Sequence, residues 1–187
     1  MRIIYNRIGG MNMEIITKRM RVRPFREADC MDAFEIYKNE DTCRYLLHEP
    51  WTKDSVEEAF RHKLSSNILT KEKGISLACE LGEKVIGDIS IWYTSMKETV
   101  EIGFAFNETY AGKGYATEAV RSTIEYVFNE LKVHRIQANL DARNLSSAKL
   151  CERVGMRKEA HFIKDYWNKG EWTDSFVYGM LMTDLEI

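Results

Sequence analysis

A short glycine-containing segment, AGKGYATEAV at residues 111–120, lies between a strand-like run and a helix-like run. Gly112 and Gly114 permit a tight turn that leaves the backbone exposed. The N–H groups in a helix's first turn lack partners and lie at the positive end of its dipole, so such a turn suits an anion. Because residues 133–141 are again strand-like, the order strand, helix, strand predicts a crossover between two parallel strands. This unit restricts the chain to an α/β fold with a candidate phosphate loop.

The composition is typical of one compact domain. The chain has 187 residues, of which 44% are hydrophobic and 30% charged, with a net charge of -2. This charge gives no general attraction to nucleic acid, so we expect no nucleic-acid partner. The four cysteines form no CxxC pair and the four histidines form no ligand cluster. We therefore predict a reduced, cytoplasmic protein that holds no metal.

Residues 1–13 are expected to form an extension outside the fold. The opening MRIIYNRIGG has no long apolar core, and Met11 and Met13 follow closely. No run reaches the ~18 apolar residues of a membrane span, so we expect no membrane partner. A single domain is then predicted over residues 14–187.

The pattern along this domain alternates between strands and helices, without repeats or linkers. An aromatic loop between the first two helices either lines a pocket or closes the core. The predicted elements are a strand at 14–23, helices at 26–39 and 53–67 with Thr52 as the second N-cap, a hairpin of strands at 75–81 and 85–93, a strand at 99–107, a helix from the glycine loop to about 131, a strand at 133–141, a helix at 144–154 and a closing hairpin around Asn168, Lys169 and Gly170.

The strand predicted at 99–107 has two dissimilar faces. Large apolar side chains occupy one face, and the other holds Glu101, Gly103 and Ala105. A carboxylate followed by almost no side-chain volume leaves room beside the strand. Either a ligand or a packed helix fills that room.

Two common nucleotide-binding motifs do not fit the glycine loop. A Walker loop requires GxxxxGK[ST], but Asn107 stands at its first glycine position and Gly114 follows Lys113. A dinucleotide fingerprint requires GxGxxG, but Thr117 replaces the third glycine. Two interpretations remain: a short cradle whose N–H groups at 112–117 face a pyrophosphate, or a turn that merely starts a helix.

Three segments, VEIGFAFN, AGKGYATEAV and NLSSAKLCERVGM, resemble in this order the GNAT acetyltransferase superfamily. The opening RVRPFREAD and closing YWNKGEWTDSFVYGML resemble its branch of ribosomal-protein serine/alanine N-terminal acetyltransferases, so the resemblance spans roughly residues 14–185. It implies a mixed, mostly antiparallel central sheet of about six to seven strands, with helices on both faces and a splayed central strand pair. It also implies acetyl-CoA as co-substrate, and relatives are often homodimers.

The resemblance implies a donor site made by a loop, a strand and a helix. The family's loop follows [Q/R]xxGx[G/A], whose positions match Ala111, Gly114 and Ala116, so the leading polar residue is missing here. Loop N–H groups hold the pyrophosphate in this family, and a strand backbone pairs with the pantetheine. The implied cofactor-binding residues are Phe104, Ala105, Phe106, Ala111, Gly112, Lys113, Gly114, Tyr115, Ala116, Thr117, Asn144 and Ser147.

The catalytic residues implied by the resemblance are Glu101 and Ser147. Glu101 matches a strand glutamate that acts as the amine base in some relatives, and a structural ion pair is the alternative. Ser147 matches a serine proposed to assist the departing thiolate. Cys151 stands where many members have a tyrosine acid, and cysteine there is typical of a small core residue. Asn144 suits helix capping and cofactor contact equally.

The expected function is transfer of an acetyl group from acetyl-CoA to a primary amine by direct attack. A protein or peptide N-terminus is the expected acceptor. The alternatives are a small-molecule amine, such as a polyamine, an amino acid or an aminoglycoside-like compound, and a CoA-binding sensor without turnover. Acidic residues within 49–58 either attract an ammonium group or form a solvated helix start.

Overall fold

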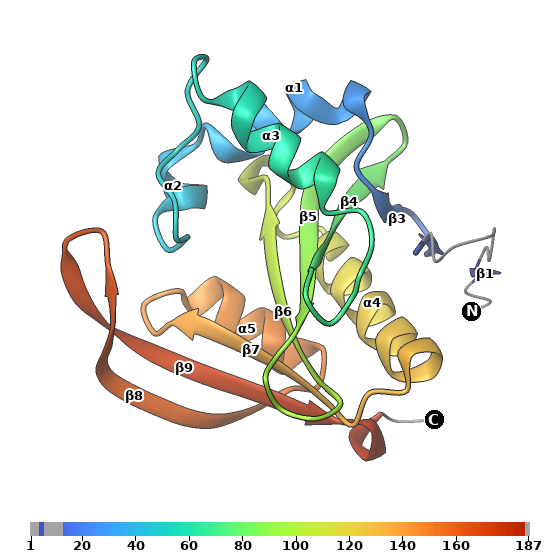
Figure 1. The fold of residues 1–187 in the computed structure, drawn as a ribbon, viewed down its shortest axis with the longest axis vertical. Helices are drawn as coiled ribbons and strands as arrows, with labels where there is room; N and C mark the ends of the chain where they lie inside the picture. The colour runs from blue at the N-terminus through green and yellow to red at the C-terminus, as the bar shows by residue number, and fades with distance from the viewer. Residues whose placement is uncertain (1–3, 6–12, 186–187) are drawn as a thin grey trace.

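The computed structural model describes residues 4–5 and 13–185, which form a single twisted sheet with helices on it (Figure 1). The strands are β1 (Ile4–Tyr5), β2 (Ile15–Ile16), β3 (Arg21–Pro24), β4 (Ile75–Leu81), β5 (Lys84–Tyr93), β6 (Thr99–Phe106), β7 (Arg135–Asp141), β8 (Arg157–Asn168) and β9 (Glu171–Leu181). These nine strands lie in the order β1-β2-β3-β4-β5-β6-β7-β9-β8, and only β6 and β7 pair in parallel. The mixed, mostly antiparallel sheet is confirmed, with more strands than we expected.

The prediction of a single strand at 14–23 is wrong, because a turn divides this segment into two strands. Thr17 N donates to Met20 O at 2.9 Å, and Met20 N donates to Thr17 Oγ1 at 3.0 Å. As a result β2 and β3 are the two arms of a short hairpin, and β3 extends one residue beyond the predicted strand, to Pro24.

Part of the predicted N-terminal extension contacts the domain. β1 pairs antiparallel with β2, and Met13 is 3% exposed within the core. Residues 1–3 and 6–12 lie outside the described residues, so the boundary at residue 14 stays a prediction.

Helices cover both faces of the sheet, as predicted. The α-helices are α1 (Cys30–Tyr37), α2 (Glu40–Cys43), α3 (Val56–Ser65), α4 (Tyr115–Leu131) and α5 (Leu145–Arg153), and the 3-10 helices are η1 (Glu27–Asp29), η2 (Glu108–Tyr110) and η3 (Met182–Asp184). α4 and α5 pack on a core cluster that includes Ile102 of β6. α1 and α3 pack on a second cluster that includes Ala105, and successive strand side chains point to opposite faces.

Two helix predictions need correction. The helix expected at 53–67 begins only at Val56, because Ser55 N donates to Thr52 Oγ1 and Thr52 N donates to Ser55 Oγ in a preceding turn. Thr52 is therefore not its N-cap. We did not predict α2, a single turn that Asn39 caps by accepting a hydrogen bond from Thr42 N at 2.9 Å.

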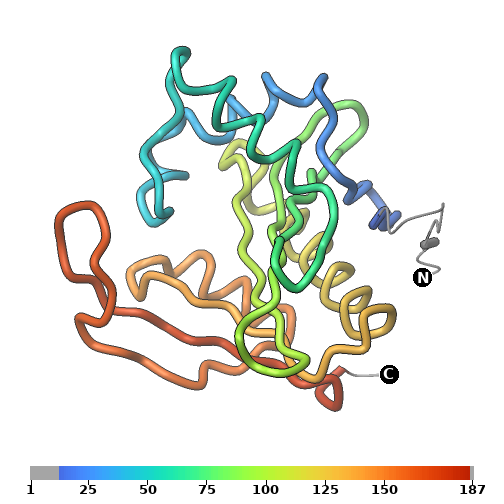
Figure 2. The backbone as a smooth tube through the Cα atoms, viewed as in Figure 1, coloured from blue at the N-terminus to red at the C-terminus, as the bar shows by residue number. Residues whose placement is uncertain are grey.

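β6 and β7 pair only near the start of each strand. Their parallel register covers residues 99–101 of β6 and 135–137 of β7, and beyond it the two strands diverge (Figure 2). β5 stays paired with β6 as far as Phe106. The splayed central pair is therefore confirmed, and Phe104, Ala105 and Phe106 present one backbone edge to the opening.

β8 and β9 form a long arm that curves away from the rest of the sheet (Figure 2). Positive φ angles at Lys169 and Gly170 confirm the turn predicted there. The tip of the arm contacts the last residue of α2 and the segment that follows this helix. Lys169 Nζ donates to Cys43 O at 2.8 Å, and Asn168 Nδ2 donates to Leu46 O at 3.3 Å. We call these four residues the tip bridge.

Candidate functional site

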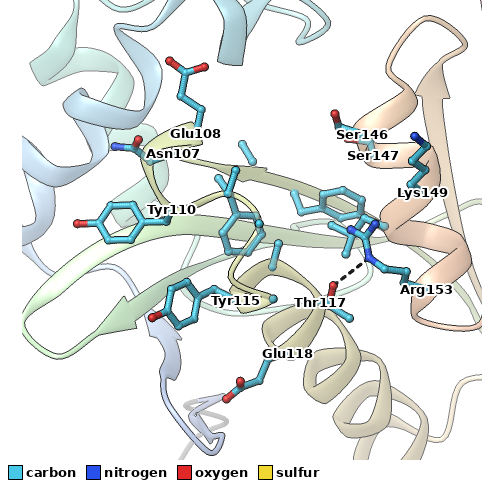
Figure 3. A pocket seen from close by; sticks show the side chains of 18 of the residues that line it. Asn107, Glu108, Tyr110, Tyr115, Thr117, Glu118, Ser146, Ser147, Lys149 and Arg153 are labelled. Carbon is cyan, nitrogen blue, oxygen red and sulfur yellow. Dashed lines mark hydrogen bonds between the residues drawn. The ribbon is translucent and has the colours of Figure 1, made fainter.

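A groove with a volume of about 1040 Å³ lies between the end of β6, the glycine loop and the first turns of α4 and α5. Figure 3 shows side chains of α5 facing the start of α4 across this groove. Every predicted cofactor-binding residue except Lys113 lines it. These are Phe104, Ala105, Phe106, Ala111, Gly112, Gly114, Tyr115, Ala116, Thr117, Asn144 and Ser147. The fold therefore brings together three segments that are separate in the sequence.

The glycine loop leaves the start of α4 open to the groove. Gly112 and Gly114 have φ angles of 74 and 78 degrees, a region that favours glycine. Gly114 is the N-cap residue, and no side chain caps this helix. The first N–H groups of α4 therefore lack intrahelical partners at the positive end of a 17-residue helix. This arrangement fits the two negative phosphates of a diphosphate.

Basic side chains add to this positive field. Arg153 Nε donates to Thr117 Oγ1 at 3.3 Å, and Arg121 Nη2 donates to Arg153 O at 2.6 Å, so the two helices are joined beside the groove (Figure 3). The basic residues that line the groove are Lys18, Arg121, Lys149 and Arg153. Sequence reasoning missed them, although the spacing of Lys149 and Arg153 puts both on one face of a helix.

The predicted pantetheine segment is held from one side only. Its residues pair with β5, through Gly87 opposite Phe106 and Asp88 opposite Ala105. Ala105 is buried against α1 and α3, and a Cβ at Gly103 would lie 3.4 Å from the Trp92 ring. Protein side chains therefore fill the small face of β6. The space left for a ligand is at the edge of the strand, where β7 has moved away.

Asn144 and Ser147 lie together at the start of α5. Asn144 Oδ1 accepts a hydrogen bond from Ser147 N at 3.1 Å, so the capping role of Asn144 is confirmed. Both residues also line the groove, and Figure 3 shows Ser147 on the side of α5 that faces it. Their contact with a cofactor and the assistance of Ser147 to a leaving thiolate stay predictions.

Glu101 lies outside the groove lining, at the point where β6 and β7 begin to diverge. Its Oε2 accepts hydrogen bonds from Gln137 Nε2 at 2.9 Å and Asn139 Nδ2 at 2.7 Å, both on β7. Within residues 4–5 and 13–185 its partners are neutral amides rather than cations, so the structure does not contain the alternative ion pair. The two amides orient the carboxylate without neutralising it, and its role as a base stays a prediction.

Cys151 is a core residue, as its type suggested. Its side chain is fully buried between α4, α5 and the sheet, and burial raises the pKa of the thiol to about 12. A thiol with this pKa stays protonated at neutral pH. The position that carries a tyrosine in many family members therefore supplies no group to the groove.

The sequence predicts no metal, no membrane partner and no nucleic-acid partner. Within the described residues, no three His, Cys, Asp or Glu side chains gather as metal ligands. The same residues contain no helix that is long and apolar enough to cross a membrane. The expected homodimer, the cytoplasmic location and the lack of a nucleic-acid partner stay predictions.

Comparison with known proteins identifies the family. The Acetyltransferase (GNAT) domain model matches residues 19–157, and the chain belongs to this family of acyltransferases. An uncharacterized N-acetyltransferase of Bacillus subtilis (strain 168), YnaD, is 31% identical over 169 residues, which cover 90% of this chain and 97% of YnaD. The crystal structure of a GNAT-family acetyltransferase from Bacillus anthracis has a TM-score of 0.82 at 30% identity, covering 91% of this chain and 99% of that chain.

Two further similar proteins have named acceptors. A [ribosomal protein uS5]-alanine N-acetyltransferase of Escherichia coli (strain K12) is 32% identical over 84 residues, which are 44% of this chain and 43% of that protein. Spermidine N-acetyltransferase from Vibrio cholerae, solved in complex with CoA and spermine, has a TM-score of 0.73 at 20% identity, covering 89% of this chain and 97% of that chain. The second match shows a shared fold alone.

Proposed function

We propose that the chain transfers an acetyl group from acetyl-CoA to a primary amine. The observation that supports this most is the uncapped start of α4, which opens into a groove of about 1040 Å³ behind two glycines with positive φ. The diphosphate binds the N–H groups from Gly112 to Thr117. The pantetheine arm follows the free edge of β6, which leads toward Glu101.

The proposed chemistry needs a base, an oxyanion donor and help for the leaving group. Bound acetyl-CoA supplies a thioester carbonyl that an amine attacks directly. Glu101 accepts the proton of the attacking amine, directly or through a water, because its two amide partners orient its carboxylate. A backbone N–H of residues 104–106 donates to the developing oxyanion, and Ser147 Oγ donates to the departing thiolate. No enzyme nucleophile is required, in keeping with the buried Cys151.

The proposed acceptor is the N-terminus of a protein or peptide. The resemblance to the ribosomal-protein branch and the partial identity with the uS5-alanine enzyme support this class. Trp167 and Trp172 beside the tip bridge are 57% and 53% exposed, and their rings lie edge to face at 5.5 Å. Such an apolar surface suits a polypeptide better than a small polycation. A polyamine is the second candidate, because the fold is shared with a spermidine N-acetyltransferase.

A donor and acceptor assay tests the proposal. The purified chain is mixed with acetyl-CoA and with peptides that begin with alanine or serine, their N-terminally blocked copies, spermidine, or buffer. We expect free thiol to appear only with unblocked peptides, and mass spectrometry to place the acetyl group on the N-terminus. Release with spermidine alone would move the acceptor to small amines. Tight CoA binding without any acceptor-dependent release would favour a sensor, and neither binding nor release would overturn the proposal.

A further inference from the structure

The side chain of Arg19, on the turn between β2 and β3, makes three contacts with the glycine loop and the start of α4. Its Nη1 donates to Lys113 O at 2.9 Å, and its Nε donates to Glu118 Oε2 at 2.7 Å. Its guanidinium carbon lies 4.4 Å from the centroid of the Tyr115 ring. A single side chain thus holds the loop carbonyl, the first turn of α4 and the aromatic ring between them. Nothing in the sequence pattern of the loop indicates this contact.

The turn that carries Arg19 is itself fastened to α4. Glu118 Oε1 accepts from Thr17 Oγ1 at 2.7 Å and from Arg19 N at 2.8 Å. Burial would raise the pKa of Glu118, but the hydrogen bonds from Thr17 and Arg19 outweigh burial and lower it. Glu118 therefore stays ionised and keeps the donors of this turn in place. We call Thr17, Arg19 and Glu118 the loop clasp.

We propose that Arg19 is a positioning residue that holds the glycine loop in the shape required for the diphosphate of the donor. This inference rests on the proposed function. Lys113 is the one predicted loop residue that does not line the groove, and its carbonyl is the group that Arg19 holds. A peptide carbonyl turned into the groove would repel a phosphate, so the clasp keeps the N–H groups facing the ligand and the carbonyl facing away.

The loop needs such support for two reasons. Gly112 and Gly114 flank Lys113 and give the backbone more conformational freedom than any other residue would. The first loop position is Ala111, whose methyl group can form neither a hydrogen bond nor an ion pair. Arg19, 94 positions from Lys113, supplies a charged hydrogen-bond donor to the loop from a distant turn.

If the loop clasp were only a structural contact, the loss of Arg19 would have different effects on donor binding. The Arg19 side chain is 39% exposed, and exposed ion pairs contribute little to stability. Loss of a structural contact would also affect every donor substrate alike. A positioning role predicts a loss confined to ligands that carry the diphosphate.

The test uses Arg19→Ala and Arg19→Lys, with Arg21→Ala as the matched control. Arg21 is on the adjacent strand and pairs with Glu14 and Glu80 instead of the loop. Three quantities are measured: the calorimetric Kd for CoA, the ratio of kcat/KM for acetyl-CoA to that for S-acetylpantetheine, which lacks the diphosphate, and backbone hydrogen exchange at 112–117 in the free protein. Melting temperatures show whether each variant folds.

For Arg19→Ala we expect CoA binding to weaken about tenfold, with the same loss for acetyl-CoA and none for S-acetylpantetheine. Exchange at 112–117 should become faster. Arg19→Lys should recover part of both effects, because lysine keeps the charge without the fork of donors. Arg21→Ala should match the wild type.

An equal loss on both donors, or unchanged exchange in the loop, would overturn the positioning role and leave the proposed function intact. A wild-type chain that neither binds CoA nor releases thiol would overturn the proposed function itself. In that case, faster backbone hydrogen exchange at residues 112–117 in Arg19→Ala would show that the loop clasp is a structural contact only.

Discussion

The donor groove and the acceptor side of this molecule are built in different ways. The groove uses backbone groups of short, local segments: a glycine loop, a strand edge and a capped helix start. The proposed acceptor side, by which we mean the tip bridge with Trp167 and Trp172, joins segments as far apart as Cys43 and Lys169, 126 positions from each other, and it meets the groove at Leu46. Local patterns therefore predict the residues that line the groove well and the contacts of the tip bridge poorly, because a contact between distant surface segments has no periodic signal.

Removal of the Glu101 carboxylate, the proposed base, should have the largest effect. Glu101→Gln keeps the shape of the side chain but loses the proton acceptor, so kcat should fall about 100-fold while the Kd for CoA stays unchanged. Steady-state kinetics and calorimetry measure both quantities. Glu108→Gln is the control, since the Glu108 carboxylate lines the groove but accepts a hydrogen bond from Asn39 instead of the β7 amides. If Glu101→Gln retained turnover within about twofold of wild type, the base would have to be sought elsewhere.

Backbone strain introduced into the glycine loop should weaken CoA binding and leave acceptor binding unchanged. Gly114→Ala forces a side chain to adopt a φ of 78 degrees, at a cost of about 1 kcal/mol in that conformation. A loop that relaxes to another conformation loses its aligned N–H groups, so CoA binding should weaken about tenfold with the KM for the acceptor unchanged. Calorimetry and acceptor titrations provide the comparison.

Gly82→Ala is the matched control for the backbone strain that Gly114→Ala introduces. Gly82 has a φ of 63 degrees in the turn between β4 and β5, with open space where a Cβ would lie and no place in the groove lining. The two variants should lose similar amounts of stability. Equal weakening of CoA binding in both would contradict a local role for Gly114.

A change at Lys169 should affect the acceptor region alone, because it leaves in place Leu46, the tip-bridge residue that also lines the groove. Lys169→Ala removes the hydrogen bond to Cys43 O and the ion pair with Glu49, whose closest atoms are 3.8 Å apart. A less restrained arm should raise the KM for a peptide acceptor about threefold, without a change in the Kd for CoA. Lys158→Ala removes an exposed lysine of the same arm whose Nζ lies 3.8 Å from the centroid of the Phe176 ring, outside the tip bridge, and it should leave both the KM and the Kd unchanged. A change in CoA affinity would contradict the separation of the two regions.

Cys151 should have the smallest effect on turnover. Cys151→Ala should change kcat by less than about twofold, because the thiol is buried outside the groove. Burial raises its pKa to about 12, so at pH 8 the reactive thiolate is a minute fraction, and it grows only as the pH approaches that value. Iodoacetamide at pH 8, followed by peptide mass spectrometry, should leave Cys151 unmodified in the folded chain. Rapid labelling, or a large loss of kcat, would show that the thiol faces the reacting groups.

Much of the fold follows from local sequence patterns. Gly112 and Gly114 can adopt left-handed backbone without steric cost, and the amide of Asn144 caps α5 through a hydrogen bond within one turn. The turn at Lys169 and Gly170 is equally local. Such features depend on neighbours in the chain, so they are visible before the fold is known.

The features that we missed depend on tertiary contacts. The turn at Thr17 splits one alternating run into two strands, and its polar groups are directed toward Glu118 on a distant helix. The positions of Lys18 and Arg121 around the groove have no common spacing. The small face of β6 was compatible with a ligand or a helix, and only the packing of Ala105 against α1 and α3 decides between them.

The central claim is that the glycine loop and the edge of β6 together bind acetyl-CoA. A crystal structure of the wild-type chain with CoA tests it most directly. We predict the diphosphate on the N–H groups from Gly112 to Thr117, and the pantetheine beside residues 104–106 with its sulfur end directed toward Glu101. CoA bound elsewhere, or bound with its diphosphate away from this loop, would contradict the account.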